Sequence, residues 1–340
     1  MFRKLRVSHL MLIGSVCLGF SLSYAATSCW ALGAPREVID PAEAQADPDF
    51  AIQGEYLGPG KLPGGEKEKI GAQVVALGQG KFDVYLLDGG LPGEGWQRGL
   101  LRMRVSASRN EAGKVSITQD QLTGEIVDGK LSLQLAEGNK VQLERVERKS
   151  PTLGAQPPEG AIVLFDGSNT DWFPGGKFGP DQSLFSGVLS KPAFNSCKIH
   201  LEFRLTWMPE ARGQARANSG VYVHNAYEIQ VLDSFGLEGH DNECGGLYSL
   251  KAPDVNMCYP PVTWQTYDIE FTAPKYDEAG NKVANARLTV RHNGVVIHDN
   301  YELPRATPGG QGEGPGPRGI QLQGHGCHVQ YRNIWVVPQD

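Results

Sequence analysis

The stretch NSGVYVHNAYEIQVLDS, residues 218–234, decides the fold. Its β-branched residues recur at alternate positions, as in a strand with one buried face: Val221, Val223, Ile229 and Val231. Glu228 and Gln230 alternate with these aliphatic residues, and Asp233 follows three residues later. Either the polar side chains face solvent without a further role, or they line a polar cleft on one face of a sheet.

The composition indicates an all-β protein of two domains. A chain of 340 residues exceeds the length of most single cores. It contains 43 glycines and 22 prolines with an ordinary hydrophobic fraction of 40%, a mixture that favours short strands joined by tight turns. Long amphipathic helical stretches are missing from the sequence, so all-β is the class that we expect.

The N-terminus has the pattern of a secretory signal peptide. Three basic residues within the first six precede an apolar run too short to span a bilayer comfortably, and small residues follow at Ser23 and Ala25. We expect a signal peptide over residues 1–25 and export to the periplasm or the extracellular space; a retained anchor is the alternative. Residues 26–46 lack periodicity and are expected to form a mobile lead-in.

The charge argues against two classes of partner. Removal of the signal peptide takes away three positive charges and no negative ones, so the net charge falls from −6 to −9. Basic runs are absent, so we expect neither nucleic acid nor an anionic membrane as a partner. No membrane span is expected in the mature chain, and the expected substrate is neutral.

Turn residues divide the rest of the chain into two β domains. Residues 47–148 contain short runs separated by "DG" and "EGN", a β-meander that could close as a small barrel or sandwich. It contains no catalytic constellation, so we interpret it as a structural or sugar-contacting accessory domain. Residues 149–160 are a proline-rich linker, and residues 161–340 form the second domain.

Alternating strands without helices predict a two-sheet jelly roll for the second domain. Asn293-Gly294 between two alternating runs is a strong hairpin signal. Strand faces that pack on the partner sheet are apolar, so polar residues should occupy the opposite faces. This polar group comprises Arg204, Glu228, Gln230, Gln321 and Gln323. Asp233 joins it only if a bulge intervenes or the strand ends near Leu232.

The cysteines are interpreted for an oxidising compartment. Cys244 and Cys258 bracket a loop rich in Gly, Pro and Asn, and we expect a disulfide between them, which contributes about 3 kcal/mol in the loop-entropy model. Cys197 and Cys327 could form a second bridge if their strands are neighbours. Zinc binding is the alternative, but the chain contains no CxxC pair.

Five motifs, in order, resemble the 3-keto-disaccharide hydrolase family. They are VLFDGSNTDWF, KIHLEFRL, ANSGVYVHNAYEIQVLDS, WQTYDIEF and GIQLQGHGCHVQYRNIWV, within residues 163–336. The resemblance implies a concanavalin A-like, laminarinase-type jelly roll that cleaves glycosides already oxidised to a ketone at C3. The family usually has Asp between the Gln and His of the last motif, where this chain has Gly324. If that Asp is a ligand, a base or a partner that orients the histidine, its loss weakens or alters activity.

Cleavage of a 3-keto-glycoside requires a base, a group that stabilises an enolate and an acid for the leaving oxygen. The ketone acidifies the C2 proton, so a base can abstract it, the C1 oxygen leaves by β-elimination and water adds to the enone. Glu228 is the candidate base. His325 is a candidate acid, enolate donor or metal ligand, and Arg204 is a candidate fixed cation. A divalent metal could take part, and the sequence does not establish a cofactor.

Other residues suit the binding of a saccharide. The candidates for hydrogen bonds to sugar hydroxyls are Asn218, Gln230, Gln321 and Gln323. Trp264 is a candidate stacking platform and is equally suited to the core.

Two alternatives are open. Glu228 and Asp233 stand at i and i+5, the outer spacing of the ExDxxE strand of laminarinase-type glucanases, whose nucleophile and acid lie about 5 Å apart. Gln230 replaces the middle carboxylate of that motif, which disfavours direct hydrolysis with Asp233 as a catalytic residue. A non-catalytic, lectin-like carbohydrate-binding module is the main alternative to an enzyme, because this fold serves both roles.

Overall fold

The computed structural model describes residues 36–119, 122–135 and 138–339. The expected signal peptide, residues 1–25, lies outside the described residues, as does the first part of the expected lead-in. Strands dominate the described chain, in which no helix is long and apolar enough to cross a membrane.

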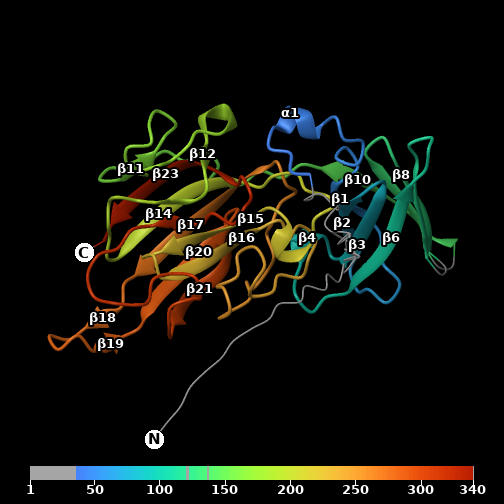
Figure 1. The fold of residues 1–340 in the computed structure, drawn as a ribbon. Helices are drawn as coiled ribbons and strands as arrows, with labels where there is room; N and C mark the ends of the chain where they lie inside the picture. Colours follow the sequence, from blue (N-terminus) through green and yellow to red (C-terminus); the bar gives the residue numbers. More distant parts are fainter. Residues whose placement is uncertain (1–35, 120–121, 136–137, 340) are drawn as a thin grey trace, which may run out of the picture. The chain divides into compact units, whose positions relative to one another are not determined.

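The first domain is a closed barrel of eight strands (Figure 1). Each barrel strand pairs antiparallel with the next one along the chain, and β10 pairs with β1 to close the ring. The strands are β1 (Gly54–Pro59), β2 (Lys69–Gly78), β3 (Lys81–Asp88), β6 (Arg102–Arg109), β7 (Val115–Gln119), β8 (Leu122–Val127), β9 (Lys130–Gln134) and β10 (Lys140–Val146). Two short strands, β4 (Leu91–Pro92) and β5 (Gly95–Trp96), lie between β3 and β6. The expected meander therefore forms a barrel, which pairs both edges of every strand in it.

The second domain is a sandwich of two antiparallel sheets, the jelly-roll class that the sequence predicted. The larger sheet has the order β11-β23-β14-β17-β20-β21, with β12 beside β23, and the smaller has the order β13-β22-β15-β16. The larger sheet contains β11 (Ile162–Phe165), β12 (Leu184–Phe185), β14 (Cys197–Arg204), β17 (Trp264–Thr272), β20 (Ala286–His292), β21 (Val295–Leu303) and β23 (Gln330–Pro338). The smaller contains β13 (Val188–Leu189), β15 (Asn218–Val223), β16 (Tyr227–Leu232) and β22 (Gln321–Leu322). Smaller elements are the ribbon of β18 (Lys275–Tyr276) and β19 (Lys282–Ala284) and the 3-10 helices η2 (Pro180–Gln182) and η3 (Gly213–Ala215).

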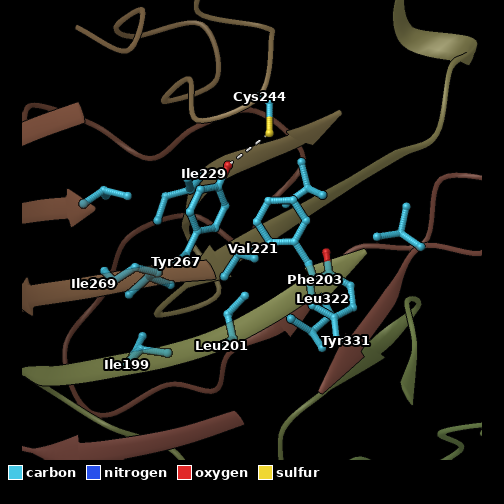
Figure 2. Close-up of a cluster of buried hydrophobic side chains, with 14 of the residues drawn as sticks. Ile199, Leu201, Phe203, Val221, Ile229, Cys244, Tyr267, Ile269, Leu322 and Tyr331 are labelled. Carbon is cyan, nitrogen blue, oxygen red and sulfur yellow. Dashed lines mark hydrogen bonds between the residues drawn. The ribbon is translucent and has the colours of Figure 1, made fainter. Parts of the chain in front are cut away.

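The two sheets enclose one hydrophobic core (Figure 2). Leu201 and Phe203 of β14 and Tyr267 of β17 pack in one cluster with Val221 and Ile229 of the smaller sheet. Full burial of side chains of this size contributes about 1.5–3 kcal/mol each, so this cluster is a major source of stability. Residues that alternate with the core positions point outward, and each sheet therefore has an outer face that carries polar side chains.

The Asn293-Gly294 hairpin is confirmed. It joins β20 to β21, and His292 pairs with Val295 across it. Asn293 has a φ of 49° and Gly294 a φ of 80°, the pair of positive values that a type I′ turn requires.

Part of the expected linker, residues 149–160, lies against the outer face of the larger sheet. Ser150 Oγ lies 2.6 Å from Thr266 Oγ1, and the Gly154 backbone N–H donates to Glu202 Oε1 at 2.6 Å. These bonds attach the segment to the second domain.

Residues 36–46, the described part of the expected lead-in, contact the second domain as well. Val38 pairs with Trp207 through backbone hydrogen bonds of 2.9 and 3.0 Å. The single-turn helix α1 (Pro41–Ala44) follows, with Asp40 as its N-cap.

The disulfide expected between Cys244 and Cys258 is not formed, because both are free thiols. Cys244 Sγ lies 3.4 Å from the Tyr267 hydroxyl (Figure 2), and Cys258 Sγ donates to the Leu232 carbonyl at 3.5 Å. Each buried sulfur thus has a polar partner outside the pair.

The second expected bridge is not formed either, since Cys197 and Cys327 are free. Cys197 pairs with Pro338 at one end of β14, whereas β23 begins at the other end, where Gln330 pairs with Arg204. Cys327 precedes β23, so the two cysteines lie at opposite ends of neighbouring strands and cannot reach one another.

Candidate functional site

The candidate site lies on the outer face of the smaller sheet, on β15 and β16. Tyr222 stands opposite Glu228 in this antiparallel pair, and Gly220 stands opposite Gln230. The odd-numbered residues of both strands belong to the hydrophobic cluster or to its border, so alternation places the even-numbered side chains on the other face. Asn218, Tyr222, Glu228 and Gln230 therefore share one face of a sheet.

Two glycines give the site its shape. A β-carbon on Gly220 would lie 2.2 Å from Glu228 Oε1, and one on Gly309 would lie 2.6 Å from the Tyr222 hydroxyl oxygen. Gly309 also has a φ of +85°, a conformation that side chains disfavour. A side chain at either position would displace the carboxylate or the hydroxyl.

A cavity of about 130 Å³ opens beside Glu228. Its lining combines one carboxylic acid with amide, phenol and imidazole groups: Gln214, Asn218, Tyr222, Glu228, Gln230, Tyr248, Gln323 and His325. Ligand sites commonly measure about 300–1,000 Å³, so this cavity can enclose part of a sugar while the remainder lies outside. A larger hollow of about 560 Å³ lies over barrel strands β7 to β10, but its described lining residues include no buried acid or base. We therefore place the site at Glu228 on its chemistry.

Glu228 is a buried acid with a raised pKa. Only 2% of the residue is exposed, and its Oε2 accepts a hydrogen bond of 2.7 Å from the Tyr222 hydroxyl. Burial disfavours the charged form and raises the pKa of Glu228 to about 7, while the hydrogen bond from Tyr222 opposes part of the rise. A carboxyl group with this pKa can accept or release a proton at neutral pH, as general acid–base catalysis requires.

Tyr222 is held as a neutral hydrogen-bond donor. Its hydroxyl also lies 3.0 Å from the Pro308 carbonyl, and it accepts from Gln323 Nε2 at 3.3 Å. Burial raises the pKa of Tyr222 well above its usual value, and the adjacent carboxylate of Glu228 adds to the rise. The phenol therefore keeps its proton beside the acid.

Amide groups form the next part of the wall. Gln214 Oε1 accepts from Asn218 Nδ2 and from Gln230 Nε2, each at 3.1 Å. Asn218 Oδ1 is buried and has no hydrogen-bond partner among the described residues. An unpaired buried acceptor costs about 1–3 kcal/mol, so a hydroxyl donor from a ligand would be favoured here.

His325 lies at the exposed rim of the same cavity, next to the position that departs from the family pattern. Gly324 packs against Gly187, and a β-carbon on Gly324 would lie 3.0 Å from the Gly187 Cα. An aspartate at position 324 therefore needs the two segments to move apart by a few tenths of an ångström.

The cavity lining offers few further ligands for a metal ion bound to His325. Glu228 is the one other side chain of a common metal-ligating type in this lining. Across the described residues, no group of three or more His, Cys, Asp and Glu side chains is placed to hold a metal ion. A metal bound beside His325 would take its remaining ligands from substrate or water.

Arg204 and Trp264 do not join this cavity, which corrects our expectation. They pair across β14 and β17 on the outer face of the larger sheet, so the hydrophobic core separates them from Glu228. Arg204 donates to Gln330 and, at 3.0 Å, to Asp181. Its guanidinium carbon lies 4.6 Å from the centre of the Trp264 ring. These contacts describe a separate polar surface of the sandwich.

Asp233 belongs to a buried ion pair. Arg216 Nε lies 2.6 Å from Asp233 Oδ2, and both side chains are almost fully buried. Asp233 does not line the cavity, so Glu228 is the single carboxylate among the described lining residues. The pair of carboxylates that direct glycoside hydrolysis uses is therefore not assembled here.

The glutamines separate into two groups. Gln230 and Gln323 line the cavity. Gln321 pairs with Tyr222 across β22 and β15 and so shares the outer face, but it lies beyond the lining.

The sequence analysis missed three polar side chains of the lining, which are Gln214, Tyr222 and Tyr248, and the loop residues Pro308 and Gly309. The sequence could have predicted Tyr222, because it lies four residues after Asn218 in the same strand and alternation places both side chains on the same face. Gln214 and Tyr248 lie in loops, and the sequence offers no periodicity that brings loop residues to a sheet face.

A sandwich with an amide-lined cavity around one buried acid is suited to a small polar ligand. Residues 160–337 match the family described as 3-keto-alpha-glucoside-1,2-lyase-like domain, and the chain belongs to this family. This confirms the resemblance to 3-keto-disaccharide hydrolases and supports a role in acting on glycosides.

No curated protein matches the chain. A crystal structure of a candidate glycosyl hydrolase from Parabacteroides distasonis ATCC 8503 is 29% identical, covers 54% of this chain and 85% of its own, and has a TM-score of 0.49. Two further candidate glycosyl hydrolases from that organism are 16% and 20% identical, with TM-scores of 0.37 and 0.36. They cover 54% and 53% of this chain and 95% and 99% of their own.

Proposed function

We propose that the jelly-roll domain cleaves 3-keto-glycosides, with Glu228 as the general base. The observation that carries the proposal is the buried Glu228 carboxyl, whose pKa is raised to about 7 by burial at the edge of an open cavity. A base with this pKa is half ionised at neutral pH and can both take a proton from carbon and return it.

The reaction begins with the sugar C2–H bond. The ketone at C3 acidifies this proton, Glu228 accepts it, and the electron pair of the C–H bond forms a C2=C3 double bond with the negative charge on the C3 oxygen. A donor beside that oxygen stabilises the enolate. Gln323 and His325 are the lining residues with N–H groups suited to this role.

Elimination and hydration complete the cycle. The enolate re-forms the C3 carbonyl, a C1=C2 double bond forms, and the C1–O bond breaks with its electron pair on the leaving oxygen, which takes a proton. His325 at the exposed rim is the candidate donor of this proton. Water then adds to C1 and gives its proton to His325, which restores the acid, and Glu228 returns its proton to C2. The net reaction is hydrolysis of the glycosidic bond.

The amides bind the sugar in this proposal. Gln230, Gln323 and Asn218 face the cavity and can bond hydroxyl groups on the ring. The free buried acceptor Oδ1 of Asn218 supports this role, because a ligand hydroxyl would satisfy it.

A lectin-like module is the second candidate. It is favoured by Gly324, which stands where the family usually has an acid, and by the small volume of the cavity, about 130 Å³. A pure binder would hold the same sugar without releasing a product.

Incubation with 3-keto-trehalose or a 3-keto-glucoside, with and without a chelator, tests the proposal through release of 3-keto-glucose. We expect release by the native protein and loss of turnover in Glu228→Gln, with sugar binding retained. Glu278→Gln, an exposed glutamate in the turn between β18 and β19, is the matched control and should turn over normally. Binding without release would replace the enzyme by the lectin-like candidate.

We also propose export after cleavage near Ala25, on the basis of the N-terminal sequence pattern. The N-terminus and mass of the protein recovered from the cell envelope or the medium test this. A retained N-terminal segment would contradict it.

A further inference from the structure

The strand that carries Glu228 has its outer edge covered by a loop. β16 is the last strand of the smaller sheet. The Gly245 N–H donates to the Gln230 carbonyl, and the Gln230 N–H donates to the Gly246 carbonyl, both at 2.9 Å. This segment therefore pairs with β16 and protects an edge that would otherwise expose unpaired backbone groups.

The same loop builds part of the cavity wall. The Tyr248 backbone N–H donates to the Glu228 carbonyl at 3.3 Å, and the Tyr248 side chain lines the cavity. The Asn242 carbonyl accepts from Gln214 Nε2 at 2.8 Å and from Gln230 Nε2 at 3.4 Å. Displacement of residues 242–248 would therefore change both the wall and the amide network of the site.

Arg98 of the barrel domain binds the chain on both sides of the segment 242–248. Its Nη2 lies 3.0 Å from the carbonyl oxygens of Glu238 and Gly239, and 3.1 Å from that of Pro253. Glu238 and Gly239 precede the segment and Pro253 follows it. One guanidinium group thus joins the two ends of the loop.

Arg102 of β6 holds the start of the same loop. Its Nη2 donates to the Gly236 carbonyl at 2.6 Å, and its Nη1 lies 3.4 Å from Glu238 Oε1. The guanidinium also stacks over the Tyr85 ring, 3.9 Å from its centre, which fixes its orientation. Gly236 approaches the barrel so closely that a β-carbon there would lie 2.4 Å from Val75 Cγ2.

We propose that the barrel is a positioning element of the sugar site: Arg98 and Arg102 hold the loop 236–253, and the loop holds Asn242 and Tyr248 against β16. Neither arginine lines the cavity, so both are positioning residues. The catalytic part of this inference rests on the proposed function, whereas its structural part does not. It gives the barrel a role that the sequence of that domain did not reveal.

Hydrogen exchange of the native chain tests the structural part without any substrate. In the double variant Arg98→Ala/Arg102→Ala, we expect the backbone amides of Gly245 and Tyr248 to exchange roughly tenfold faster, because the loop opens more often. Barrel amides in β7 to β9 should keep their rates. Unchanged exchange in the loop would overturn the proposal.

Arg104→Ala is the matched control. Arg104 lies on the same strand as Arg102, but its ion pair of 2.9 Å is with Asp83 inside the barrel domain. The Arg104→Ala variant should leave the backbone hydrogen exchange of residues 245–248 unchanged. Equal acceleration in this variant would mean that general loosening of the barrel, rather than the two contacts, controls the loop.

Kinetics on a 3-keto-glucoside test the consequence for the site. The double variant should raise KM roughly tenfold with a smaller effect on kcat, because the loop orders the binding wall. Faster exchange with unchanged kcat/KM would overturn the role in the site. If neither the native protein nor a variant cleaves the sugar, the proposed function fails. The positioning role is then decided by hydrogen exchange of the loop and by the affinity of the native protein and the double variant for the sugar.

Discussion

The Tyr222 hydroxyl and the Glu228 carboxylate meet across β15 and β16 at 2.7 Å, and this contact moderates the pKa of the buried acid. Burial raises the pKa of Glu228, and the donated hydrogen bond lowers it, because the bond is made to the charged form. The balance of these two effects gives a value of about 7. The phenol is therefore part of what makes the acid usable as a base.

Tyr222→Phe removes the donor and should raise the pKa of Glu228 further. A base acts in its ionised form, so kcat/KM for a 3-keto-glucoside should rise with pH through about 7 in the native protein. In the variant the rise should lie at higher pH, by roughly one unit. The pH profile of kcat/KM measures this shift. An acid limb at the same pH in both proteins would rule out this role of Tyr222.

Glu228 should also make the protein less stable as the pH rises. Its pKa is raised from 4.5 in the reference state to about 7 in the fold, so the folded state binds more protons between these values. Stability from this group is complete below pH 4.5 and is lost as the pH rises through about 7, by ~3 kcal/mol in total. Glu228→Gln should therefore gain stability relative to the native protein between pH 5 and pH 8, as measured by denaturant unfolding. A difference that does not change with pH would refute this.

Asp233→Asn should damage the fold rather than the chemistry. It leaves the buried Arg216 guanidinium without its carboxylate, and breaking such a pair costs about 3–5 kcal/mol. Unfolding in denaturant measures the loss. The fraction that remains folded should cleave a 3-keto-glucoside at the native rate. Full stability with abolished turnover would instead identify Asp233 as a catalytic group.

Gly324→Asp and Gly324→Ala should both lose stability, by about 1–3 kcal/mol, because a β-carbon meets the Gly187 backbone at 3.0 Å. The alanine variant isolates the steric effect, so any change in turnover seen only with aspartate belongs to its carboxylate. Thermal unfolding of both variants measures the cost. Native stability in both would mean that the two segments separate easily.

Glu202→Gln should weaken the attachment of the linker segment. Glu202 is buried, yet hydrogen bonds from His200, Asn333, Arg332 and the Gly154 N–H outweigh burial and lower its pKa to about 2. Its stabilisation is therefore present above pH 4.5 and is lost as the pH falls through about 2. The variant should be less stable by ~3 kcal/mol at pH 7, with a smaller deficit near pH 3, in denaturant unfolding. An equal deficit at both pH values would contradict the linkage.

Alternation in the sequence predicted much of the site but could not complete it. Glu228, Gln230 and Gln323 were expected on a polar face and do line one cavity. Alternation assigns a residue to a face of its strand, but not the strand to a sheet, so Arg204 was grouped with them although β14 belongs to the other sheet. Tyr222 required the cross-strand register, which depends on pairing rather than on local sequence.

The loops and cysteines show the same limit. Gln214 and Tyr248 reach the cavity through long-range hydrogen bonds that have no local sequence signal. Spacing and composition predicted a bond between Cys244 and Cys258; the fold does place the two side chains in contact, but both are free thiols, and each also contacts a further polar group. Asn293-Gly294 was predicted correctly because its turn conformation is determined by the two residues themselves.

The exchange of aromatic side chains between the two domains has a consequence for how the chain unfolds. Trp207 of the sandwich packs in the hydrophobic cluster of the barrel, and Tyr85 and Trp96 of the barrel pack in that of the sandwich. Unfolding of either domain would remove these aromatic side chains from the core of the other domain and expose its apolar surface. The two domains should therefore unfold together in one calorimetric transition. The barrel therefore cannot be moved to another protein without damage to the sandwich. Without the barrel, the core of the sandwich would lose the Trp96 indole ring and keep a cavity of that size.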